Sequence, residues 1–111
     1  MSLSHRPTAV FCSNDLMAIG LMRKAYELSI NIPRDLSAVG IDDIPSAQCM
    51  IPALTTVQMP QNQIASIAFR GLLDFAEPAF RGDSPPMVAI KPNLILRSST
   101  TLAPGRISTY R

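Results

Sequence analysis

Short apolar runs alternate with longer helical segments along the chain, and this alternation predicts the fold class. Thr8–Cys12 (TAVFC) and Leu36–Ile41 (LSAVGI) are apolar nearly throughout, which is typical of strands covered on both faces. Leu54–Gln58 (LTTVQ) also has strand character, and Met87–Ile90 and Asn93–Arg97 are expected to form the last two strands. Strands that alternate with helices indicate an α/β domain with a parallel, Rossmann-like sheet and flanking helices.

The first helix is predicted to run from Asp15 to about Ser29. Ser13, Asn14 and Asp15 supply N-cap chemistry directly after the first strand. The first two turns are apolar all the way round, whereas a surface helix of an α/β domain needs only one apolar stripe. The second apolar face must therefore meet either another subunit or another element of the same chain.

A second helix is predicted from about Gln61 to Glu77, because Pro60 stands where a helix start tolerates proline. Its apolar residues follow helical spacing, so one face is expected to pack and the other to be wet. These residues are Ile64, Ile67, Ala68, Gly71, Leu72 and Phe75. Glu77–Pro86 is expected to be a loop and Thr101–Arg111 a frayed tail.

The composition indicates one globular domain. The chain has 111 residues, of which 47% are hydrophobic and 16% charged, so a packed core is expected. The sequence shows no secretory signal and no apolar run long enough for a membrane span, which favours a cytoplasmic protein. Cys12 and Cys49 are far apart in apolar stretches and are expected to be reduced core thiols.

The charge pattern bears on nucleic acid binding. The formal net charge is only +2, and the cations are scattered apart from the pair Arg23-Lys24. A DNA-binding surface normally carries a clustered basic stripe. This segment is therefore not expected to touch DNA itself.

Two polar residues follow predicted strands and are candidates for ligand contacts. Asn14 follows the first strand and Asp42 follows the second, and ligands of open α/β sheets bind outside the carboxyl ends of the strands. An amide donates and accepts, and a carboxylate can accept from two hydroxyls at once, which suits a polyhydroxylated small molecule. Taken singly, each residue is as well explained by local structure, as a helix N-cap for Asn14 and a turn aspartate for Asp42. Their shared position at strand ends favours a binding site.

Enzymatic functions find little support. Asp42 and Asp43 are neighbours at a strand end, so their side chains point to opposite sides and do not make a natural acid–base pair. A magnesium site would require further acidic residues, and the single histidine, His5, lies in the N-terminal tail. The sequence contains no nucleophile elbow, phosphate-binding glycine loop or metal-spaced Cys/His cluster. No catalytic residue, metal or cofactor is expected.

Read in order, four segments of the chain resemble the lactose/galactose-repressor family of bacterial transcriptional regulators. They are PTAVFCSNDLMAIGLMRKAYE (Pro7–Glu27), IPRDLSAVGIDDI (Ile32–Ile44), IPALTTVQ (Ile51–Gln58) and LILRSST (Leu94–Thr100). Their spacing also agrees, so the resemblance covers about nine-tenths of the chain. Transport-type sugar-binding proteins share the fold and parts of the first two segments, but the last two are more typical of repressors.

The resemblance implies the C-terminal part of an effector-binding, periplasmic-binding-protein-like domain, formed by residues 7–100 between flexible tails at 1–6 and 101–111. Asn14 and Asp42 match the positions that contact a sugar or purine effector. Ile19 and Met22 on the first helix, and Met50, match the family's dimer interface. Leu54–Gln58 would be a crossover, after which the second helix belongs to another subdomain. Effector binding would shift the protein between two packings and so control paired DNA-binding heads.

The departures from the family pattern limit what this chain can do. The helix-turn-helix head and the first half of the sensor are absent from these 111 residues, together with the rest of the pocket wall. Ser29 stands where many relatives carry glycine, and the position of Met50 is often aromatic. On its own the fragment is expected to bind effector weakly and to self-associate through bare apolar faces. The alternatives are a fragment of a transport-type sugar-binding protein and an α/β fragment with no activity of its own.

Overall fold

The computed structural model describes residues 6–77 and 87–103. The chain divides into two compact units, with unit 1 assigned to the ranges Met1–Gln58 and Leu94–Arg111 and unit 2 to Met59–Asn93. The boundary after Gln58 agrees with the predicted crossover. Residues 1–5, 78–86 and 104–111 lie outside the described residues, and so do His5, most of the expected loop and most of both expected tails.

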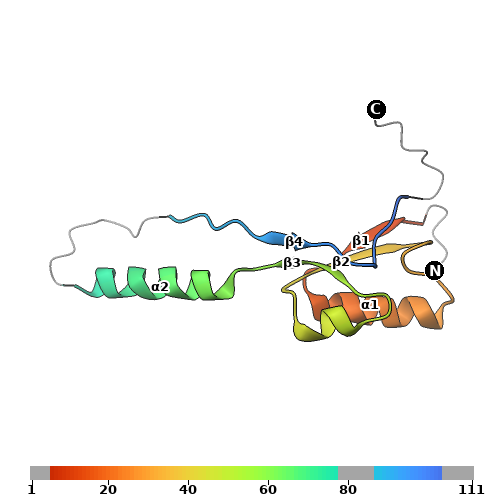
Figure 1. Ribbon diagram of the computed structural model, residues 1–111, viewed down its shortest axis with the longest axis horizontal. Helices are drawn as coiled ribbons and strands as arrows, with labels where there is room; N and C mark the ends of the chain where they lie inside the picture. Colours follow the sequence, from red (N-terminus) through yellow and green to blue (C-terminus); the bar gives the residue numbers. More distant parts are fainter. Residues whose placement is uncertain (1–5, 78–86, 104–111) are drawn as a thin grey trace, which may run out of the picture. The chain divides into compact units, whose positions relative to one another are not determined.

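The sheet has four strands in the order β1-β2-β3-β4, which are Ala9–Phe11, Ser37–Ile41, Thr55–Gln58 and Asn93–Ile95 (Figure 1). Adjacent strands from β1 to β3 are parallel, as the alternating pattern predicts. Phe11 is paired with Val39 and Val39 with Thr55, so the carboxyl ends of these three strands lie at one edge. The fold class expected from the sequence is confirmed.

Helix α1 (Asp15–Glu27) connects β1 to β2 and packs against β2 (Figure 1). Its buried residues recur at helical spacing and form the face that meets the sheet. They are Asp15, Ala18, Met22 and Ala25. The helix ends two residues before the expected limit because Ser29 has a φ of 56° and begins a Schellman-type cap. In that cap the amide of Ser29 donates to Tyr26 O over 3.0 Å and the amide of Ile30 to Ala25 O over 2.8 Å.

The core of unit 1 lies between the sheet, α1 and a short 3-10 helix, η1 (Pro45–Cys49). Its buried cluster consists of Cys12, Ala18, Met22, Ala38, Ala47 and Leu54. Burial raises the pKa of the Cys12 thiol, which favours an unreactive side chain there. Cys49 is exposed, so the expectation of a core position for it is wrong.

The first strand is much less covered than its apolar sequence predicts. Val10 is half-buried, and Ala9 and Phe11 on either side of it are exposed. The expectation that this run is buried on both faces is wrong: successive side chains of a strand point to opposite faces, and only the face of Val10 is partly covered. Ala9 and Phe11 thus form an exposed apolar face, as expected for this fragment.

The returning chain completes unit 1 by inserting side chains between strands. Ser99 is fully buried: its hydroxyl donates to Ala38 O over 2.6 Å and accepts from the amide of Thr55 over 2.8 Å. Thr101 is held as well, since its amide donates to Ser37 Oγ over 3.1 Å. Strand β4 stops at Ile95 rather than Arg97 because the amide of Arg97 donates to a side chain, Thr55 Oγ1, over 3.0 Å.

Unit 2 is built on α2 (Gln61–Ala76), which follows Pro60 as expected but contains no buried residue. The prediction that one face of this helix packs is therefore wrong for this chain by itself. The apolar face instead lines an open groove of about 530 Å³ together with Val88 and Ile90. Met87–Ile90 does not form the expected strand, because the described part of unit 2 offers it no partner strand.

Candidate functional site

Asn14 stands immediately after β1 and is the N-cap of α1. Its backbone is extended, and its Oδ1 accepts a hydrogen bond of 2.8 Å from the amide of Met17. The local role foreseen from the sequence is therefore present. The cap uses only the side-chain oxygen of Asn14. The side-chain NH2 of this half-exposed residue donates to none of the described residues. This NH2 group is the part of the side chain that can donate to a ligand.

Asp42 directly follows β2 in a backbone conformation that is rare for a residue with a side chain. Its φ is 111°, and that of Asp43 is 53°, so two successive residues lie at positive φ. The amide of Asp42 donates to Val57 O over 2.9 Å, which fixes its backbone against β3. The half-buried Asp42 carboxylate forms no hydrogen bond with any of the described residues. Unusual backbone conformations of this kind cluster at functional sites.

Parallel pairing brings the two candidates to the same edge of the sheet. Phe11 and Val39 are paired residues of adjacent strands, and Asn14 and Asp42 each lie three residues beyond them. Both therefore leave the sheet at its carboxyl edge at the same level, where ligands of such sheets bind. An amide donor and a carboxyl acceptor are thus supplied from neighbouring connections.

A buried carboxylate that the sequence did not reveal, Asp15, holds these connections together. Asp15 is fully buried; its Oδ1 accepts from Thr56 Oγ1 over 2.5 Å and its Oδ2 from the amide of Ile44 over 2.9 Å. The residue next to Asn14 is thereby tied to the loop that carries Asp42. Gly40 allows this approach, because a Cβ on it would collide with Asp15 Oδ1. The sequence predicts only a contribution of Asp15 to the N-terminal cap of the helix.

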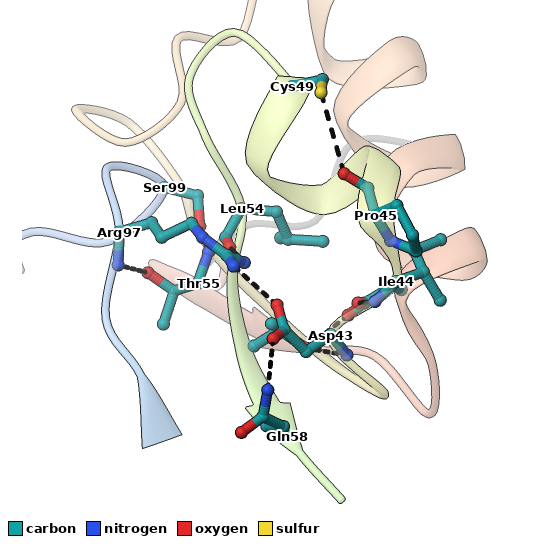
Figure 2. A network of polar contacts seen from close by, with 11 residues as sticks. Asp43, Ile44, Pro45, Cys49, Leu54, Thr55, Gln58, Arg97 and Ser99 are labelled. Carbon is teal, nitrogen blue, oxygen red and sulfur yellow. Dashed lines mark hydrogen bonds and ion pairs between the residues drawn. The ribbon is translucent and has the colours of Figure 1, made fainter. Parts of the chain in front are cut away.

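A second network, centred on Asp43, was also missed. Figure 2 shows the Asp43 carboxylate between Arg97 and Gln58: Arg97 Nη2 donates to one oxygen over 2.6 Å and Gln58 Nε2 to the other over 2.8 Å. The side chains of Asp43 and Arg97 are only 14% and 17% exposed. Asp43 thus turns away from solvent towards its protein partners. The prediction that it does not act with Asp42 on one substrate bond stays a prediction.

The residues expected at a dimer interface lie together on the outer side of α1. Ile19, Met22 and Met50 line one open groove of about 570 Å³, with Tyr26 and Ile51. Ile19 and Met50 are half-buried and pack against the core cluster, and Met22 is buried as a member of that cluster. Tyr26 and Ile51 are 84% and 97% exposed. Leu16, Met17 and Tyr26 stay exposed on α1, so within the described residues packing inside the same chain accounts for only part of this second apolar face, and the dimer interface stays a prediction.

Two kinds of feature are absent from the described ranges 6–77 and 87–103. Neither helix there is long and apolar enough to cross a membrane. Acidic, cysteine and histidine side chains do not gather there into a group of three or more that could hold a metal ion.

Comparison with known proteins gives the family. The sequence pattern of the periplasmic binding protein-like domain matches residues 1–100. Over 111 residues the chain is 39% identical to the HTH-type transcriptional repressor PurR of Escherichia coli O1:K1 / APEC, covering 100% of this chain and 31% of the repressor. The chain therefore spans about a third of the length of the curated relatives it matches.

Solved structures agree with this match. A sugar-binding transcriptional regulator of the LacI family from Escherichia coli, complexed with phosphate, gives a TM-score of 0.70 at 35% identity, over 87% of this chain and 34% of the regulator. The lac repressor dimer bound to operator and the anti-inducer ONPF gives 0.76 at 29% identity, over 86% of this chain and 32% of the repressor. These relatives are transcriptional regulators, and the predicted resemblance is confirmed. The chain belongs to the periplasmic-binding-protein-like domain family and matches the effector-binding part of lactose-repressor-type regulators.

Proposed function

We propose that this chain senses a small-molecule effector and contributes to dimerisation in a cytoplasmic DNA-binding repressor, with Asn14 and Asp42 as effector contacts. The observation that carries the proposal is the common level of these residues at the carboxyl edge of two paired parallel strands. DNA would be contacted through a domain outside this chain, in line with its scattered cations.

The chemistry of the two groups limits the effector class. The Asp42 carboxylate accepts hydrogen bonds, and the Asn14 NH2 donates one, so the ligand must present at least two donors near an acceptor. Adjacent sugar hydroxyls meet this requirement, and so does the N–H-rich edge of a purine base. We assign residues 7–100 to the effector-binding domain. The apolar part of such a ligand would contact pocket residues that lie outside this range.

Isothermal titration calorimetry on the full-length protein tests the proposal, with galactose, ribose, sucrose, hypoxanthine and guanine as probes. Asp42→Asn removes the charge at nearly constant size and is expected to weaken binding by about 10- to 100-fold, the value of a hydrogen bond to a charged group. Asp35→Asn is the matched control, because Asp35 is an exposed carboxylate paired with Arg34 in unit 1. Unchanged affinity in Asp42→Asn would remove Asp42 from the site, and no binding of any probe would reject these ligand classes.

The dimerisation part of the proposal rests on the groove lined by Ile19, Met22 and Met50. A mostly apolar surface, with Tyr26 and Ile51 largely exposed and Arg23 as its one charged lining residue in the described chain, is typical of an interface. Ile51→Asp places a charge on this surface without entering the core. Light scattering of the full-length protein is expected to show the variant as a monomer at concentrations where the parent is a dimer. An unaltered dimer would move the interface elsewhere.

A further inference from the structure

One side chain, that of Asp43, forms hydrogen bonds with both passages of the chain between unit 1 and unit 2, in addition to the pairing of β3 with β4. Gln58 is the last residue of unit 1 before the chain enters unit 2 at Met59. Arg97 lies three residues after Leu94, where the chain returns to unit 1. The two oxygens of Asp43 bind these two residues separately, Oδ2 taking Gln58 Nε2 at 2.8 Å and Oδ1 taking Arg97 Nη2 at 2.6 Å.

Arg97 is itself anchored to the adjoining strand, so the pair with Asp43 is not a loose surface contact. Its Nη1 donates to Leu54 O over 2.9 Å, and its backbone amide donates to Thr55 Oγ1 over 3.0 Å. Both charged side chains are more than four-fifths buried. Burial strengthens such hydrogen bonds and makes the loss of one partner costly, so the contacts resist independent movement.

The loop that carries Asp43 also carries the proposed effector contact. Asp42 and Asp43 are consecutive residues at positive φ, with φ values of 111° and 53°. The amide of Asp42 donates to Val57 O over 2.9 Å, one residue before Gln58. A displacement of Asp42 is therefore passed through one peptide unit to a carboxylate that holds both passages.

We propose that Asp43 is a positioning residue that couples the effector site to both connections with unit 2, by holding Gln58 on one passage and Arg97 on the other. The coupling to effector rests on the proposed function of Asp42, whereas the holding of the passages does not. In a sensor of this kind, a ligand that pulls on Asp42 shifts the exit points of both passages together. A single carboxylate would thus bias the two-state equilibrium between the units.

Hydrogen exchange measured by mass spectrometry on the full-length protein, without ligand, tests the holding role. In Asp43→Asn we expect about tenfold faster exchange at the amides of Asp42, Arg97 and Ser98, which bond to Val57 O, Thr55 Oγ1 and Ala53 O. The amides of Ala18 and Ile30 at the two ends of α1 are expected to exchange as in the parent. Asp35→Asn, which removes an exposed carboxylate, should change none of them.

Arg97→Lys provides a second variant should Asp43→Asn fail to fold. It keeps the positive charge but cannot engage Leu54 O and Asp43 through two separate nitrogens, so the same amides should loosen less. Unchanged exchange at Arg97 and Ser98 in both variants would overturn the proposal. An equal increase throughout unit 1, α1 included, would also overturn it, because it would indicate general destabilisation.

Calorimetry with the five probes separates this inference from the proposed function. For a probe that binds the parent, Asp43→Asn should weaken binding about threefold to tenfold, and Asp42→Asn should weaken it more while leaving exchange at Arg97 unchanged. If Asp42→Asn left the affinity for the probe unchanged, the proposed effector site would be rejected. The hydrogen-exchange result for Asp43→Asn would then decide by itself whether Asp43 holds the two passages. Faster exchange in Asp43→Asn with unaltered binding would reject the coupling.

Discussion

The two units contain similarly apolar helices that reach opposite states of burial. In unit 1, α1 buries Asp15, Ala18, Met22 and Ala25 against the sheet, whereas no residue of α2 in unit 2 is buried. The difference does not come from the helices, because α2 has the more regular apolar stripe. It comes from the presence of a sheet face beside α1. Helical periodicity thus indicates that a face requires a cover and leaves open which part of the protein supplies it.

The two units also differ in the polarity of the surface that each one exposes. The groove of α2 is lined on both sides by residues of unit 2 and has no polar anchor among the lining residues of the described chain. The edge of unit 1 instead carries a network of carboxylates with assigned partners. This contrast supports our proposal that the apolar groove is a place for packing and that the polar edge is the place for recognition.

The largest expected difference between the units concerns buried carboxylates. Asp15→Ala leaves the amide of Ile44 and the hydroxyl of Thr56 without their acceptor, and each buried donor left unsatisfied costs about 1–3 kcal/mol. Urea unfolding of the full-length protein should show a loss of about 2–6 kcal/mol. Asp74→Ala on the exposed surface of α2 is the matched control and should change stability by less than about 0.5 kcal/mol. Similar losses at both sites would break the comparison.

Leucine truncation tests the same contrast in the apolar residues. Leu54 is fully buried in unit 1, and Leu72 is 64% exposed in unit 2. In the 111-residue chain we expect Leu54→Ala to cost about 2–5 kcal/mol and Leu72→Ala less than about 0.5 kcal/mol. Repeating the measurement in the full-length protein sharpens the result. A much larger loss for Leu72→Ala there would show that a segment outside this chain covers α2.

A serine-to-glycine exchange should have opposite signs in the two helices. Ser29 occupies a left-handed conformation at the C-terminal cap of α1, where glycine carries no Cβ penalty, so Ser29→Gly should stabilise unit 1 by about 0.5–1 kcal/mol. Ser66 lies inside α2, where glycine is a poorer helix former than serine, so Ser66→Gly should destabilise by about 0.5 kcal/mol. Thermal unfolding measures both. A loss at Ser29 would contradict the assigned cap.

The smallest effect concerns an exposed ion pair of unit 1. The pKa of Asp35 is lowered, first by its hydrogen bond from Arg34 and then by the amide of Asn31. A folded-state pKa below the unfolded one gives stability that is present above the unfolded pKa and is lost as pH falls through the folded pKa. Asp35→Asn should therefore lower the melting temperature slightly near pH 7 and not at all in strong acid. A difference that persists in acid would exclude this charge effect.

Much of the fold follows from local sequence pattern, and the exceptions have a common cause. The alternation of apolar runs predicts three parallel strands and both helices, and the crossover after Gln58 coincides with the unit boundary. The predictions are wrong where a hydrogen bond to a side chain, or the lack of a neighbouring strand, outweighs the local sequence pattern. The amide of Arg97 bonds to Thr55 Oγ1 and shortens β4, and Met87–Ile90 has the sequence of a strand but no partner strand in the described part of unit 2.

The candidate site divides in the same way. The positions of Asn14 and Asp42 at strand ends could be predicted, because strand ends and parallel order are local inferences. The roles of Asp15 and Asp43 could not, since their partners Thr56 and Arg97 lie 41 and 54 residues away in sequence. A carboxylate next to a predicted ligand residue is the only signal that the sequence offered for either.

The position of Ser99 has a consequence for how the protein acquires its structure during synthesis. Its hydroxyl joins β2 to β3, and its carbonyl accepts from the amide of Ala38, although 61 residues separate the two along the chain. Unit 1 is consequently discontinuous, and translation must pass through all of unit 2 before the sheet is complete. Until Ser99 has been synthesised, its backbone partners in β2 and β3 lack these hydrogen bonds. The incomplete sheet can then bind chaperones or associate with other nascent chains.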